Sequence, residues 1–136
     1  MENTPSFSII LLGIIYDPEK KKILIGRREN DPDIPKLSWV FPGGRLKVGE
    51  DVGKAFKDRI KENTGLEVGN LGSVFSKTYP EKNDLFAIYF LCEVRKGKEK
   101  TGGEITELKW VNPEDLEKNF TTSFHPRLKE YIINLK

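Results

Sequence analysis

One segment with helical spacing, set among segments that read as strands, most constrains how this chain can fold. Its apolar residues recur at i, i+3, i+4 and i+8, as on one face of an α-helix: Val52, Ala55, Phe56 and Ile60. We predict that the helix begins near Asp51 and stops at Gly65, because glycine readily adopts the left-handed conformation that ends helices. The apolar face of such a helix must pack against another element.

The segments on both sides of this helix have the apolar and β-branched composition of strands. We predict strands over residues 6–17, 22–29, 39–42, 67–80, 83–96 and 105–111. Pro42 to Arg45 is predicted to form a turn, and polar residues predict loops over 30–38 and 97–104. A short helix is predicted over residues 112–118, with Asn112 as its cap, and a last helix over 123–135.

Strands and helices do not alternate regularly along the chain, which argues against a doubly wound sheet. We therefore expect an α+β fold, in which a mixed β-sheet has helices packed on its faces. A length of 136 residues suffices for one hydrophobic core, so we predict one domain over residues 1–136.

Composition limits the partners and the compartment. The 23 basic and 21 acidic residues give a net charge of +2, which provides no reason to expect binding to nucleic acid. The apolar run near the N-terminus is too short to span a bilayer, so we expect no membrane association. Cys92 is the single cysteine, which fits a reducing cytoplasm, where we expect the protein to be located.

The residues just before the helix suggest a site for phosphate and metal. Gly43 and Gly44 allow backbone groups to approach a charged ligand, and a free carbonyl there can coordinate a cation. Arg45 offers a fork of donors to phosphate oxygens. Taken alone, the tetrapeptide Pro-Gly-Gly-Arg favours a simpler interpretation, a tight turn with a surface arginine.

The spacing that follows changes this interpretation, because it resembles the signature of the Nudix hydrolases. That signature runs Gly, five residues, Glu, seven residues, Arg-Glu, an apolar residue, any residue, Glu-Glu, any residue, Gly and an apolar residue. The positions that agree are Gly44, Glu50, Ile60, Glu62, Gly65 and Leu66. The flanking segments WVFPGG and ELKWVNPEDL agree as well, so the resemblance covers nearly the whole chain.

The resemblance implies the Nudix fold, in which a mixed sheet is sandwiched between helices as α/β/α. It implies a metal-dependent hydrolase, with Mg²⁺ or Mn²⁺ as cofactor. The implied substrate is a small nucleoside diphosphate linked to another group, such as a nucleotide sugar or ADP-ribose-like compound. Water would attack the diphosphate or the adjoining sugar carbon. Dimers are common in the family, so a homodimer is among the assemblies it implies.

Three positions depart from the signature. Asp58 replaces its arginine, Arg59 replaces a glutamate and Asn63 replaces the last glutamate. The expected set carries a net charge of −2, whereas the set found here carries −1. Hard divalent cations prefer anionic oxygen, and an arginine cannot act as a general base, so this acidic cluster is weakened.

Other acids can compensate for the missing ones. The metal ligands we expect are the Gly44 carbonyl, Glu62, Glu50 and Glu104, and the catalytic candidates are Glu62, Glu104 and Glu107. Asp58 and Glu62 lie one turn apart and could share a metal, but we favour pairing of Asp58 with Arg59 or Lys61. Glu104 is equally consistent with a solvent-facing loop acid.

The expected substrate-binding residues are three arginines and an aromatic side chain: Arg45, Arg27, Arg28 and Trp39. Arg27 and Arg28 are also consistent with exposed residues at a strand end. Trp39, Phe86 and Tyr89 could stack on a base, although aromatic residues in strands more often belong to the core.

The chain is also similar to one branch of the family, the GDP-mannose mannosyl hydrolases, in WVFPGGR and in FHPRLKEY. The histidine that this branch uses falls at Ile105, so its mechanism does not transfer. His125 is expected to cap or pack rather than catalyse. Two alternatives to a diphosphate hydrolase stay open: a catalytically impaired domain that binds nucleotides as a regulatory module, and a nucleoside triphosphate pyrophosphatase.

Overall fold

A computed structural model describes residues 5–29, 38–121 and 123–135, so the loop predicted over 30–38 lies outside the described residues except for Ser38. The elements follow the order β1 (Ser8–Asp17), β2 (Lys22–Arg28), β3 (Trp39–Val40), β4 (Gly43–Leu46), α1 (Val52–Thr64), β5 (Leu66–Tyr79), β6 (Lys82–Gly97), β7 (Ile105–Val111), η1 (Pro113–Asp115), η2 (Glu117–Asn119) and α2 (Pro126–Ile133). Within this described part, no helix is long and apolar enough to cross a membrane.

Helix α1 begins and ends where the sequence predicts. The side chain of Asp51 accepts a hydrogen bond of 3.0 Å from the backbone N–H of Lys54, as an N-cap does. Gly65 has a φ of 76° in the left-handed region, and its N–H donates to the carbonyl of Lys61 at 2.8 Å. Both signals act over one helical turn, so the sequence alone determines them.

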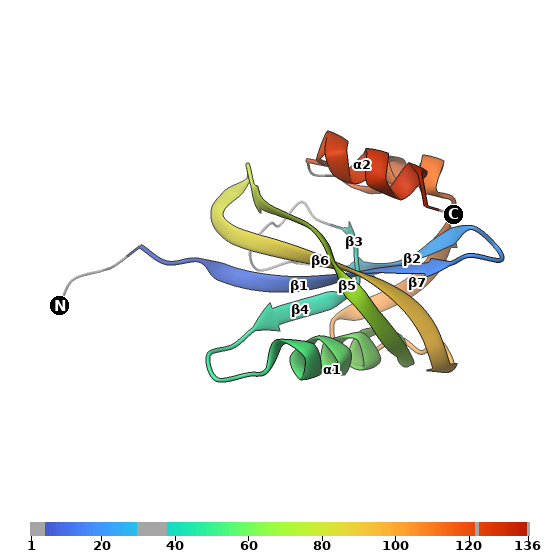
Figure 1. Cartoon of the computed structure of the whole chain (residues 1–136), viewed down its shortest axis with the longest axis horizontal. Coiled ribbons are helices and arrows are strands. Elements are labelled where there is room, and N and C mark those ends of the chain that lie inside the picture. Colours follow the sequence, from blue (N-terminus) through green and yellow to red (C-terminus); the bar gives the residue numbers. More distant parts are fainter. Residues whose placement is uncertain (1–4, 30–37, 122, 136) are drawn as a thin grey trace.

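The strands of the described residues form a mixed seven-stranded sheet with β1 at its centre (Figure 1). Strand β1 runs parallel to β6, and on its other side it pairs antiparallel with β2 and then with β4. Strands β3 and β7 both pair with β2, and β5 pairs with β6 at the opposite edge.

Alternation along β1 divides the core between the two faces of the sheet. Leu11 and Ile15 pack with Phe56 on the α1 side. Leu12 and Ile14, which point the other way, pack with a cluster that includes buried residues of α2. Figure 1 shows α1 and α2 on opposite sides of the strands. The expected α+β fold with an α/β/α arrangement is confirmed.

The turn predicted from Pro42 to Arg45 is wrong, because residues 43–46 form strand β4. Backbone pairing with β1 places Gly44 opposite Leu11 and Gly43 opposite Leu12. Gly43 has a φ of 149°, and a Cβ added there would overlap the carbonyl oxygen of Leu11. The glycine therefore allows two strands to approach closely, and this requirement depends on a partner far away in sequence.

The helix predicted over residues 112–118 is also corrected, since this segment forms two 3₁₀ helices. The Asn112 side chain makes no capping bond to the backbone, and its amide lies 3.5 Å from Oδ2 of Asp115 instead. The N–H of Leu116 donates to Pro113 and that of Asn119 to Leu116, both with i→i+3 spacing. Leu116, between the two 3₁₀ helices, is the buried residue of this segment, and one short turn on each side of it is enough to bring its side chain into the core.

Candidate functional site

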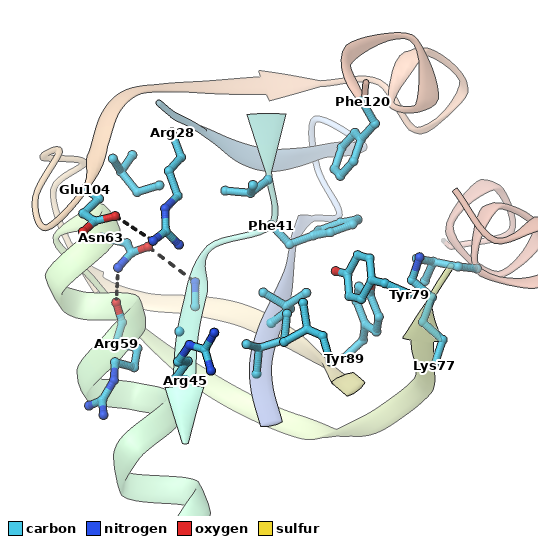
Figure 2. A pocket seen from close by; sticks show the side chains of 18 of the residues that line it. Arg28, Phe41, Arg45, Arg59, Asn63, Lys77, Tyr79, Tyr89, Glu104 and Phe120 are labelled. Atoms are coloured by element: carbon cyan, nitrogen blue, oxygen red, sulfur yellow. Dashed lines mark hydrogen bonds and ion pairs between the residues drawn. The ribbon is translucent and has the colours of Figure 1, made fainter. Parts of the chain in front are cut away.

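A cavity of about 250 Å³ lies where the C-terminal half of α1 faces strand β4 and the loop before β7 (Figure 2). One end is polar and is lined by Arg28, Gly43, Gly44, Arg45, Arg59, Glu62, Asn63 and Glu104. The other end is aromatic and is lined by Phe41, Lys77, Tyr79, Tyr89, Phe120 and Phe124. In Figure 2 the labelled arginines and Lys77 lie at opposite ends, with Phe41 between them.

Strand β4 brings the two glycines of the motif against α1. The N–H of Gly43 points to Oδ1 of Asn63 at 3.5 Å, and Nδ2 of Asn63 donates to the carbonyl of Arg59 at 2.9 Å. A Cβ added to Gly44 would lie 3.1 Å from Cδ of Arg59. The amide that replaces an expected glutamate therefore connects the helix to the strand.

Glu50 is held by two neighbours at the start of α1. Its Oε1 accepts a hydrogen bond of 2.7 Å from the N–H of Lys47, and both of its oxygens lie 2.9 Å from Nη2 of Arg59. These bonds, first from Lys47 and then from Arg59, lower the pKa of Glu50 below its ordinary value. Glu50 is not among the described residues that line the cavity. Its charge is therefore neutralised by Arg59 next to the cavity and does not face it.

Glu62 and Glu104 are the carboxylates that line the polar end. Nη2 of Arg28 binds Oε2 of Glu104 at 2.6 Å, although the Glu104 side chain is largely exposed. The carboxylate of Glu62 has no hydrogen bond or ion pair to the residues the structure describes, and its Oε1 lies 2.8 Å from where a Cβ of Gly103 would stand. Glu62 and Glu104, predicted as site residues from separate parts of the chain, thus line one cavity together with Gly44 and Arg45.

The other predicted site residues lie outside the described lining of this cavity. Arg27 is 3.9 Å from both Glu107 and Glu29, and all three side chains are largely exposed. The ammonium of Lys109 lies 4.1 Å from the centre of the Trp39 ring. Arg27, Glu107 and Trp39 therefore have contacts of their own on the edge formed by β2, β3 and β7.

Asp58 forms a different pair from the one expected. Its Oδ2 lies 2.9 Å from Nζ of Lys54, one helical turn earlier, so its ion pair is with Lys54 rather than with Arg59 or Lys61. The hydrogen bond from Lys54 lowers the pKa of Asp58. Asp58 is exposed, and it is absent from the described lining of the cavity.

Sequence reasoning missed most of the aromatic end. Tyr89 was a candidate for stacking and lines the cavity, whereas Phe86 packs with Phe7 at a ring distance of 6.1 Å. Lys77 and Tyr79 are two positions apart on β5, so strand alternation places them on one face. The residues around Lys77 and Tyr79 in the sequence do not indicate that this face of β5 lines a cavity that extends to α1.

The oxygen ligands available at the polar end suit a metal ion that binds together with a diphosphate. In the described ranges no three acidic, histidine or cysteine side chains gather as a metal site, and Glu50 and Glu104 are engaged by arginines. Mg²⁺ typically takes one or two carboxylates and completes its shell with phosphate oxygens and water. Glu62 and Gly44 both line this end, so one carboxylate and one backbone carbonyl are candidates for the protein's part of such a shell.

Comparison with protein families matches residues 8–132 to the NUDIX domain. A MutT-like protein of Streptomyces ambofaciens is 25% identical over 130 residues, which cover 94% of this chain and 79% of the relative. An ADP-ribose pyrophosphatase of Methanocaldococcus jannaschii is 33% identical over 109 residues, 78% of this chain but only 62% of the relative. The crystal structure of a NUDIX hydrolase from Nitrosomonas europaea has a TM-score of 0.75 at 17% identity, with 96% of this chain and 72% of that chain covered.

Proposed function

Because this chain belongs to the NUDIX domain family, we propose that it hydrolyses a nucleoside diphosphate linked to a second group. The substrate would be a nucleotide sugar or an ADP-ribose-like compound. The family and the ADP-ribose pyrophosphatase relative support hydrolase activity on such compounds. The observation that carries the proposal is one cavity, in which an arginine-lined end with Glu62 continues into an aromatic end.

The polar end suits a diphosphate. Arg28 and Arg45 line it together with the backbone of Gly43 and Gly44, and guanidinium forks match phosphate oxygens in geometry and charge. Because Arg59 already holds Glu50 through both carboxylate oxygens, we assign it to the support of α1. The group that the diphosphate links to the nucleoside would extend from this end of the cavity toward solvent.

Nudix hydrolases generally use divalent metal ions. Here Glu62 and the Gly44 carbonyl would hold Mg²⁺ or Mn²⁺ with the diphosphate, and the ion would neutralise charge that develops on the phosphate oxygens.

Glu104 is our candidate for the proton acceptor. It is the second carboxylate on the cavity, and Arg28 holds it in position at 2.6 Å. When the diphosphate engages Arg28, the carboxylate would be released to accept a proton from the attacking water. The water oxygen then bonds to phosphorus as the bridging P–O bond to the leaving phosphate breaks. In the alternative, it bonds to the sugar carbon as the C–O bond to the leaving nucleoside diphosphate breaks.

The test is hydrolysis of nucleotide sugars, ADP-ribose, dinucleoside polyphosphates and nucleoside triphosphates, each with magnesium, manganese or a chelator. Glu62→Gln removes one charge at the cavity, and Glu67→Gln is its matched control, because Glu67 lies outside the lining and pairs with Lys61 and Lys96. We expect metal-dependent turnover of a diphosphate-linked compound that is lost in Glu62→Gln and kept in Glu67→Gln.

Two results would contradict this proposal. Preferential turnover of triphosphates would instead identify a triphosphate pyrophosphatase. Binding of nucleotides without turnover at high protein concentration would identify a binding module, and the replacement of two expected glutamates by Arg59 and Asn63 would then explain the lost chemistry.

A further inference from the structure

The aromatic end of the cavity is lined by rings that pack against one another and leave part of their surface open. Phe41 forms its centre, with ring centroids 5.5 Å from Tyr89, 5.3 Å from Phe120 and 6.4 Å from Phe124. Phe41 and Tyr89 are buried, whereas Phe120 and Phe124 are only half-buried and keep part of their surface open. Aromatic faces of this kind stack on nucleobases, and such stacking tolerates any base.

One cation interrupts these apolar walls. Nζ of Lys77 lies 4.3 Å from the centre of the Tyr79 ring, and the Lys77 side chain is half-buried (Figure 2). The negative charge of Glu81 acts electrostatically on the Lys77 ammonium. The Glu81 carboxylate itself accepts hydrogen bonds of 2.7 and 2.8 Å from the backbone N–H and the hydroxyl of Ser123. Within the described residues Lys77 has no ion pair, and burial lowers the pKa of its ammonium.

We propose, building on the hydrolase function above, that the aromatic end binds the nucleobase and that Lys77 selects bases with a carbonyl oxygen at purine position 6 or pyrimidine position 4. The bases favoured are 6-keto purines such as guanine and 4-keto pyrimidines such as uracil. Adenine and cytosine carry an amino group at the same place. The substrate class is then a guanosine or uridine diphosphate compound.

The selection follows from the hydrogen-bonding capacity of an ammonium group. The Lys77 ammonium has donors and no acceptor, so it pairs with the O6 and N7 of guanine or the O4 of uracil. An exocyclic amino group is itself a donor, so at this edge adenine offers the ammonium only N7 and cytosine only its ring N3, without the carbonyl oxygen of the keto bases. Because the site is partly shielded from water by Tyr79 and its neighbours, such a mismatch costs more than it would in solvent.

The test uses GDP-glucose, UDP-glucose, ADP-glucose and CDP-glucose, which differ only in the base. We expect kcat/KM for the two keto bases to exceed that for the two amino bases by roughly tenfold or more, the discrimination of one good base contact. Lys77→Met keeps the length of the side chain without its charge and should abolish this preference. Lys77→Arg keeps the charge and should retain it.

Lys109→Met is the matched control, because the Lys109 ammonium also lies over an aromatic ring, that of Trp39, but outside the described lining of the cavity. This variant should leave the preference among the bases unchanged. The inference would be overturned if adenine compounds are hydrolysed as well as guanine ones, or if Lys77→Met slows all four substrates equally.

Binding of GMP and AMP without metal, measured by calorimetry, separates this inference from the hydrolase proposal. Tighter binding of GMP that is lost in Lys77→Met would support base selection even if no diphosphate sugar is hydrolysed. Equal affinities for GMP and AMP, or no binding of GMP, would overturn it whatever the hydrolysis shows.

Discussion

Both carboxylate oxygens of Glu50 lie 2.9 Å from Nη2 of Arg59, so the arginine that replaces an expected acid neutralises another acid of the same motif. Asn63, a second replacement, bonds to the carbonyl of Arg59 and faces the N–H of Gly43. Both replacements therefore connect α1 to the loop and strand before it. The site loses negative charge through these replacements, and it gains contacts that hold α1 against β4 and the preceding loop.

The Glu50–Arg59 pair should stabilise the fold in a pH-dependent way. The backbone N–H of Lys47, and then Arg59, hold the folded-state pKa of Glu50 below its ordinary value of 4.5, so the stabilisation is present above that value. It is lost as the pH falls through the lower folded-state pKa. Melting temperatures of Glu50→Gln, Arg59→Gln and the double variant should show a coupling at neutral pH that disappears in acid. A coupling independent of pH would contradict this account.

Asp58→Asn should leave catalysis nearly unchanged. Asp58 pairs with Lys54 on the exposed face of α1, away from the cavity, so kcat/KM should stay within about twofold of wild type, as for other exposed pairs. Metal titrations of the same variant should superimpose on those of wild type. A large rise in the metal concentration needed would show instead that Asp58 and Glu62 share the ion.

Gly102→Ala should lower both stability and activity, because a Cβ at this position would overlap the carbonyl oxygen of Glu62. Overpacking of this kind costs roughly 1–3 kcal/mol, measurable by urea unfolding. The loop would also move Glu104 away from the cavity. Gly49→Ala is the control: Gly49 has a φ of 88°, with nothing within 4 Å of an added Cβ, so the variant bears backbone strain alone. Equal loss of activity in both variants would refute the role of the close contact.

His125 should matter for stability and not for turnover. Its Nδ1 accepts a hydrogen bond of 3.1 Å from the N–H of Arg127 at the start of α2, and its ring packs 5.0 Å from that of Phe75. His125→Ala should cost about 0.5–2 kcal/mol, the usual range for an N-cap. His125→Asn supplies another capping oxygen and should recover part of this loss. Activity that falls in both variants while folding is intact would assign the histidine to the reaction.

The sequence determined the features that depend on local spacing. The apolar positions of α1, its cap at Asp51 and its end at Gly65 all act within a few residues, so the helix could be predicted closely. Gly44 and Glu62, which the spacing of the Nudix signature singles out, both line the polar end of the cavity. A pattern of residues suffices here because one helix carries most of it.

Only the tertiary structure decided which side chains are engaged and what completes the site. Glu50 and Glu104 each have an arginine partner, and Gly43 belongs to a strand because β1 lies beside it. Lys77 and Phe120, from β5 and the segment before α2, line one cavity with Glu62 of α1. Such arrangements depend on strand pairing and packing between distant segments, which local residue patterns do not specify.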